Sequence, residues 1–159
     1  MNRNRRDIMP EGSLNLPPTY FIELPPFLED GKELLIVQMK SVSNNKYVEI
    51  GFDEFFYAIG DTPLTGKIFS LILLEDNNIL IRLHGSRFLR IDENGYLVVD
   101  VNNQGPGTFK VDRVDNMLYS LKAPNGKYIR VRSEDNILVA DEDVMNESTT
   151  FKFRLINYY

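Results

Sequence analysis

Residues 121–131 read LKAPNGKYIRV, and two earlier stretches of the chain have the same arrangement. Residues 39–50 read MKSVSNNKYVEI, and residues 81–91 read IRLHGSRFLRI. Each stretch has an apolar residue and a base, then a turn, a second base, an aromatic residue and two aliphatic residues two positions apart. The stretches begin at residues 39, 81 and 121, which are 42 and 40 residues apart. This regular spacing indicates an internal repeat.

Two further sets of landmarks keep the same period. One set consists of small or aliphatic residues that follow the aromatic residue by 11 or 12 positions: Ala58, Val99 and Ala140. The other consists of phenylalanines that are 40 and 42 residues apart: Phe69, Phe109 and Phe151. We expect these phenylalanines to be buried at equivalent positions, and likewise the first residues of the three stretches, which are Met39, Ile81 and Leu121.

The segments that carry these landmarks are typical of β-strands. Runs of four to eight residues rich in Val, Ile, Leu, Tyr and Phe alternate with clusters of Asn, Asp and Gly at intervals of about ten residues. No stretch has the apolar spacing of a helix. A β-propeller also uses units of four strands, but it has about four to eight of them, so three repeats are too few for a propeller. The pattern therefore predicts an all-β fold, a β-trefoil with pseudo-threefold symmetry, whose repeats span about 33–77, 78–116 and 117–157.

Residues 1–32 have a different composition and are predicted to form an extended N-terminal arm. They contain five of the eight prolines, and proline lacks the N–H that a helix interior or a central strand needs. The apolar run from Tyr20 to Phe27 is expected to dock on the barrel. The trefoil domain is then predicted to span residues 33–159.

The third repeat resembles the repeat of the fascin-like β-trefoils. Their pattern has a Leu-Lys-x-x-x-Gly-Lys/Arg-Tyr-Leu core, a later Leu-x-Ala and a closing Phe, and residues 121–131, 138–140 and 151 resemble it. The resemblance covers roughly residues 33–157, and it is close in the third repeat, fair in the second and loose in the first. Fascins join four trefoils and bundle actin, whereas this chain has room for one trefoil. The resemblance implies a β-trefoil and, for an oligomer, actin binding or crosslinking.

Alignment of the repeats also places bases at equivalent positions. Lys46, Arg87 and Lys127 precede the three aromatic residues, and Arg90 and Arg130 are equivalent to each other, with Glu49 at the third position. In a trefoil such residues lie around one axis, so they predict a ligand-binding surface for an acidic protein or glycan. The alternative is a solvated face that carries bases for solubility and for protection of strand edges.

Catalytic, cofactor and metal sites are not predicted. The chain has no cysteine, and its one histidine, His84, lies in a predicted turn without a second histidine to complete a metal site. The stretch from Gly60 to Ile68 superficially resembles a phosphate-binding loop. It has five residues between its glycines where four are needed, and Ile68 where Ser or Thr is needed. We therefore interpret it as a turn.

Charge and hydropathy exclude further classes of protein. A net charge of −5 is the wrong sign for general nucleic-acid binding. No run of 18 apolar residues is present, and the basic N-terminus has no apolar segment after it, so membrane insertion and a signal peptide are not expected. The chain is expected to be cytoplasmic, and export without a signal stays open.

These observations predict a non-enzymatic binding or adaptor module for a protein surface or a glycan. An actin-binding oligomer is the alternative within binding proteins. A glycoside hydrolase is the enzymatic alternative, because the separation of two carboxylates depends on the fold.

Overall fold

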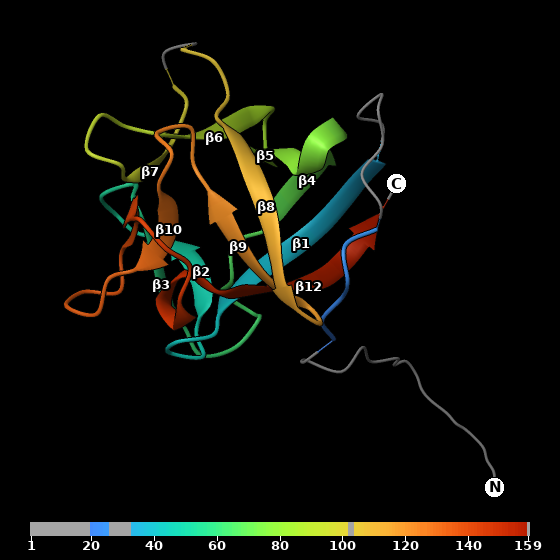
Figure 1. The fold of residues 1–159 in the computed structure, drawn as a ribbon, viewed down its shortest axis with the longest axis horizontal. Helices are drawn as coiled ribbons and strands as arrows, with labels where there is room; N and C mark the ends of the chain where they lie inside the picture. The colour runs from blue at the N-terminus through green and yellow to red at the C-terminus, as the bar shows by residue number, and fades with distance from the viewer. Residues whose placement is uncertain (1–19, 26–32, 102–103, 159) are drawn as a thin grey trace, which may run out of the picture.

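The structure is a computed structural model that describes residues 20–25, 33–101 and 104–158 (Figure 1). The parts of the predicted N-terminal arm at residues 1–19 and 26–32 lie outside the described residues. Twelve strands are present in the described part: β1 (Glu33–Ser41), β2 (Tyr47–Ile50), β3 (Phe56–Gly60), β4 (Phe69–Leu73), β5 (Asn78–Leu83), β6 (Arg87–Ile91), β7 (Leu97–Val99), β8 (Thr108–Asp115), β9 (Leu118–Lys122), β10 (Tyr128–Val131), β11 (Leu138–Glu142) and β12 (Phe151–Tyr158). Two single-turn 3₁₀ helices, η1 (Glu75–Asn77) and η2 (Glu147–Thr149), complete the elements.

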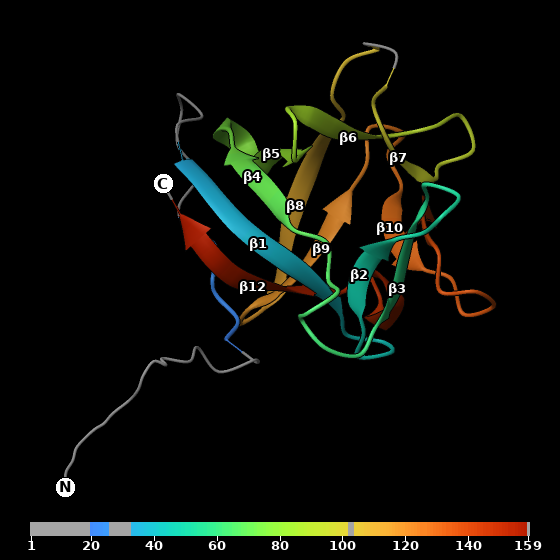
Figure 2. The same cartoon turned by 180° about the vertical axis from the view of Figure 1, so that it is seen from behind.

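Six of these strands form a closed barrel. Strand β1 pairs with β12 and with β4, β4 pairs with β5, β5 with β8, β8 with β9, and β9 with β12, all antiparallel. The hairpins β2–β3, β6–β7 and β10–β11 lie together at one end of the barrel (Figures 1 and 2). Closure leaves no barrel edge unpaired. A barrel of six strands capped by three hairpins confirms the predicted β-trefoil.

Direct hydrogen bonds join the three hairpins to one another. The backbone N–H of Ala58 donates to the carbonyl of Asn136 at 2.8 Å, and the N–H of Ala140 donates to the carbonyl of Gly95 at 2.7 Å. The first and second hairpins are therefore both bonded to the third. The expected repeat positions Ala58 and Ala140 lie at the centre of these contacts.

The core is built from the repeat landmarks. The six residues expected at equivalent buried positions are all at most 1% exposed: Met39, Ile81, Leu121, Phe69, Phe109 and Phe151. Alternation along the strands also places Val48, Leu89 and Ile129 in the core. The aromatic residues Tyr47 and Tyr128 are buried as well. Burial of the landmarks explains why the repeat spacing is visible in the sequence.

The described part of the arm, residues 20–25, lies on the barrel beside β12 and β9. The N–H of Ile22 donates to the carbonyl of Phe153 at 3.1 Å, and the N–H of Leu24 donates to the hydroxyl of Tyr119 at 2.8 Å. The side chains of Ile22 and Leu24 pack against the core. The division of the chain at residue 32 stays a prediction.

Glu23 ties this segment to the turn between β8 and β9. Its carboxylate accepts hydrogen bonds from Arg113 Nε at 3.0 Å and from the backbone N–H of Met117. Desolvation opposes the charged form, but the bonds from Arg113 and Met117 outweigh it and hold the pKa of Glu23 below its usual value.

Replacing Glu23 with glutamine is expected to reduce stability in a pH-dependent way. Because the pKa of Glu23 is lowered in the folded state, its contribution is present above the ordinary carboxyl pKa of about 4.3 and is lost as the pH falls through the folded value. Thermal unfolding of wild type and Glu23→Gln from about pH 7 to about pH 3 should show a difference that becomes smaller as the pH falls. Glu93→Gln, at an exposed position, is the control. A constant difference across this range would contradict the role of the charge.

No helix in the described residues is long and apolar enough to cross a membrane.

Candidate functional site

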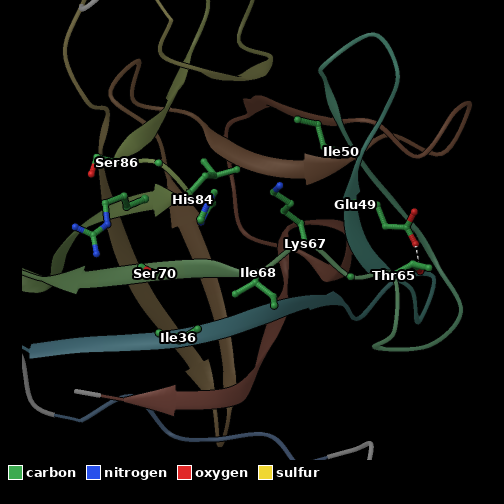
Figure 3. A pocket seen from close by; sticks show the side chains of 13 residues that line it. Ile36, Glu49, Ile50, Thr65, Lys67, Ile68, Ser70, His84 and Ser86 are labelled. Atoms are coloured by element: carbon green, nitrogen blue, oxygen red, sulfur yellow. Dashed lines mark hydrogen bonds between the residues drawn. The ribbon is translucent and has the colours of Figure 1, made fainter.

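A cleft of about 770 Å³ opens between the first and second repeats (Figure 3). We call it the inter-repeat cleft. Its lining comes from β1, β2, the loop before β4, β4, β5 and the turn after β5: Ile36, Glu49, Ile50, Thr65, Gly66, Lys67, Ile68, Ser70, Arg82, Leu83, His84, Gly85 and Ser86. The lining combines aliphatic side chains with acidic, basic and hydroxyl groups.

The polar groups of the cleft differ in whether they already have partners. The hydroxyl of Thr65 donates a hydrogen bond to the carboxylate of Glu49 at one end of the cleft in Figure 3. In contrast, the side chains of Lys67, Arg82 and His84 make no hydrogen bond or ion pair with any described residue. Two permanent positive charges are thus available to a ligand in the cleft.

The buried side chain of Gln38 positions the loop that carries Lys67. Its amide Nε2 donates to the carbonyls of Pro63 at 2.7 Å and of Gly66 at 2.9 Å, and only 3% of Gln38 is exposed. The N–H of Lys67 donates to the carbonyl of Val48 at 2.8 Å. A Cβ at Gly66 would lie 3.0 Å from Nε2 of Gln38, so the loop approaches closely where glycine allows it. These contacts hold the backbone of Lys67 against β2.

Arg82 breaks the symmetry of its repeat position. Its counterparts Lys40 and Lys122 place their ammonium groups over aromatic rings, at 5.0 Å from Tyr47 and 5.4 Å from Tyr128. Arg82 makes no such ring contact with a described residue. Strand β5 instead presents it to the cleft. In the first and third repeats, the base at this position contacts an aromatic ring of its own repeat. In the second repeat, the equivalent base lines the cleft instead.

The bases predicted from the sequence are mostly neutralised by neighbouring carboxylates. Lys46 pairs with Asp61, Lys127 with Asp143, Arg130 with Asp141, and Arg90 lies 3.7 Å from Asp100. The exception is Arg87, which is exposed and makes no ion pair in the described part of the chain. None of these five bases lines the inter-repeat cleft. Their role as a binding surface stays a prediction.

Hydrogen bonding in these pairs stabilises the charged forms. The bond from Lys46 lowers the pKa of Asp61, and the bond to Asp143 raises the pKa of Lys127. Arg130 binds both oxygens of Asp141, with Nε at 2.6 Å and Nη2 at 3.2 Å, which raises the pKa of Arg130. Bidentate geometry of this kind makes the strongest of such pairs. A ligand that used these bases would first have to displace their carboxylates.

Sequence reasoning missed the cleft residues as a group. Lys67 lies in a stretch whose sequence indicates a turn, and Arg82 is the base at the second position of the stretch 81–91. Glu49 stands where the other two repeats have Arg90 and Arg130. The signal in the sequence that could have identified a cleft residue is a departure from the repeat pattern. Glu49 replaces a base at its repeat position, and its carboxylate lines the cleft.

Among the described residues, no group of three or more His, Asp or Glu side chains could hold a metal ion. His84 lies in the exposed turn after β5, as predicted.

No protein-family model matches the chain, and no curated protein matches its sequence. Solved structures do match. The designed threefold-symmetric protein ThreeFoil has a TM-score of 0.63 at 11% identity and covers 77% of this chain and 98% of its own. The BEL β-trefoil has a TM-score of 0.63 at 12% identity, with 87% and 100% covered. SeviL bound to the asialo-GM1 saccharide has a TM-score of 0.58 at 11% identity, with 78% and 99% covered.

The match to a GlcNAcα1-4Gal-releasing endo-β-galactosidase from Clostridium perfringens covers only 33% of that enzyme. At identities this low, likeness shows the fold alone. Taken with the closed barrel and the three bonded hairpins, these structures establish that the chain is a β-trefoil.

Proposed function

We propose that this β-trefoil is a non-enzymatic module that binds an acidic glycan in the inter-repeat cleft. The observation that carries the proposal is the pair of bases without a partner among the described residues, Lys67 and Arg82, in the lining of this cleft. The guanidinium fork of Arg82 suits the paired oxygens of a carboxylate or a sulfate, and Lys67 adds a point charge. Charged hydrogen bonds of this kind are the strongest that a cleft can offer a ligand.

The rest of the lining supports a sugar rather than a simple ion. Glu49, Thr65 and Ser70 provide acceptors and hydroxyls for the hydroxyl groups of a sugar. Ile50 and Ile68, the latter 49% exposed, offer an aliphatic wall to its C–H faces. The lining contains no aromatic side chain on which a neutral sugar could stack. Charge is therefore expected to contribute most of the affinity.

The net charge of −5 does not oppose this binding strongly. Solvent ions screen interactions beyond about 8–10 Å, so the local charges decide. The lining contains two bases, Lys67 and Arg82, and one carboxylate, that of Glu49. The similar structure of SeviL holds a saccharide, and we extend sugar recognition from it to this chain as part of the proposal.

Binding without turnover is part of the same proposal. Glycoside hydrolysis normally uses two carboxylates that flank the bond. Glu49 is the one acidic side chain that lines the inter-repeat cleft. Actin binding is supported by the fascin-like resemblance alone, and co-sedimentation with actin filaments tests it.

A glycan array with sulfated, uronic-acid and neutral saccharides, followed by titration of the binders, tests the proposal. Wild type should bind acidic saccharides and lose affinity as salt rises. The double variant Lys67→Gln, Arg82→Gln should bind about a hundredfold more weakly, because each lost charged hydrogen bond costs about 1.5 kcal/mol or more.

The matched control removes two charges from the third repeat, as Lys127→Gln, Arg130→Gln. These bases are paired with Asp143 and Asp141, so binding should be unchanged. If the control lost binding and the cleft variant kept it, the basic surface predicted from the sequence would be the site. Equal binding of neutral saccharides, release of hydrolysis products, or binding of none of the saccharides would overturn the proposal.

A further inference from the structure

A second hollow adjoins the turn between β5 and β6. This β6 cavity has a volume of about 440 Å³, and its lining residues are Gly85, Ser86, Arg87, Phe88, Asp100, Val101, Gly105 and Pro106. It shares Gly85 and Ser86 with the inter-repeat cleft. The two hollows therefore meet at a single exposed turn, which Ser86 marks in Figure 3.

The turn leaves room for a ligand to pass from one hollow to the other. Gly85 has a φ of +83°, and a Cβ built on it would meet no atom within 4 Å. Both Gly85 and Ser86 are exposed. The backbone of this turn is thus exposed to solvent. Its only side chain at these two positions is the small one of Ser86, which ends in a hydroxyl group.

Arg87 provides an available charge in the β6 cavity. Its counterparts in the first and third repeats, Lys46 and Lys127, are paired with Asp61 and Asp143, each of which directly follows the second strand of its hairpin. Arg87 makes no such pair with a described residue. The second repeat alone has its base at this position unpaired, as judged from the described part of the chain.

The acid at the equivalent position of the second repeat is Asp100, and it binds other groups. Asp100 follows β7, and its two carboxylate oxygens accept the backbone N–H groups of Gln104 and Gly105, both at 3.0 Å. Asp100 also lies 3.7 Å from Nε of Arg90. Its charge is therefore offset by other partners, although it lines the same cavity as Arg87.

We infer that the ligand is a linear glycan with repeated acidic groups that crosses the turn at Gly85 and Ser86. One acidic group binds Lys67 and Arg82, and a later one along the glycan binds Arg87. The inference rests on the proposed function of the inter-repeat cleft and specifies the length and charge pattern of its ligand. Sulfate and carboxylate present the same oxygens to these bases, so both are tested.

Titration with size-defined oligosaccharides tests this inference. Heparin-derived disaccharides, tetrasaccharides and hexasaccharides provide sulfated chains, and oligogalacturonates of the same lengths provide carboxylated ones. For wild type, affinity should rise by about tenfold from the disaccharide to the hexasaccharide in at least one series, since a further charged contact forms. Stoichiometry should stay at one oligosaccharide per chain, which excludes a gain from two proteins on one oligosaccharide.

Arg87→Gln should remove the gain with length and leave disaccharide affinity unchanged. Lys46→Gln, at the equivalent paired position, should keep the full gain. A length-independent affinity in wild type, or an unchanged gain in Arg87→Gln, would overturn the inference while the cleft function stood. Failure of every acidic oligosaccharide to bind would instead overturn the proposed function and the inference with it.

Discussion

Replacing Phe109 with alanine is expected to lower the free energy of unfolding by about 3–5 kcal/mol. Phe109 is fully buried in β8, and it occupies the same repeat position as Phe69 and Phe151. Removing the ring leaves a cavity that the surrounding barrel residues cannot fill without breaking strand pairing, because the barrel is closed. The loss should be close to the upper limit for a single core substitution.

Chemical denaturation followed by tyrosine fluorescence or circular dichroism measures this loss. Phe52→Ala is the matched control, because it removes the same ring from a side chain that is fully exposed in the turn between β2 and β3. The control should change stability by less than about 0.5 kcal/mol. Equal midpoints for wild type and Phe109→Ala would show that Phe109 is not a core residue.

Gly95→Ala is expected to destabilise the protein by about 2–5 kcal/mol, through two causes. Gly95 has a φ of +88°, which strains any residue with a Cβ. An added Cβ would also lie 2.8 Å from the backbone oxygen of Ala140. The carbonyl of Gly95 accepts the hydrogen bond that joins the second hairpin to the third. The hairpins would have to separate to make room.

Gly126→Ala separates the two causes. Gly126 has a φ of +82°, and a Cβ there would meet nothing within 4 Å. This variant therefore carries the backbone strain alone, about 1–2 kcal/mol. The difference between the two variants measures how closely the hairpins approach. If both variants lost the same stability, the contact between Gly95 and Ala140 would not limit packing.

The fold could be predicted from the sequence because the residues that recur with the repeat period are buried in the core. Phe69, Phe109 and Phe151 fill equivalent places in one core, and a smaller or polar residue at any of them would leave a void or an unpaired group. Packing thus constrains residue type at a fixed spacing along the chain. The spacing can therefore be recognised from the sequence alone.

The candidate site could not be predicted in the same way. Sequence reasoning identified a set of equivalent bases, but it could not tell which of them are paired. Asp61, Asp143 and Asp141 lie 11 to 16 residues from the bases they bind. Their side chains meet the bases across hairpins, so the pairing depends on strand register and loop geometry.

By itself, the sequence determined the three repeats, the strand-rich class and the identity of the core, because each depends on residue type and periodicity. The tertiary structure alone decided which charges face solvent without a partner and which parts of different repeats form one hollow. Lys67 and Arg82 are 15 residues apart in the chain, on a loop of the first repeat and a strand of the second. They line one cleft because the barrel brings β4 beside β5 and the buried Gln38 holds the loop before β4. Long-range contacts of this kind leave no periodic trace in a single sequence.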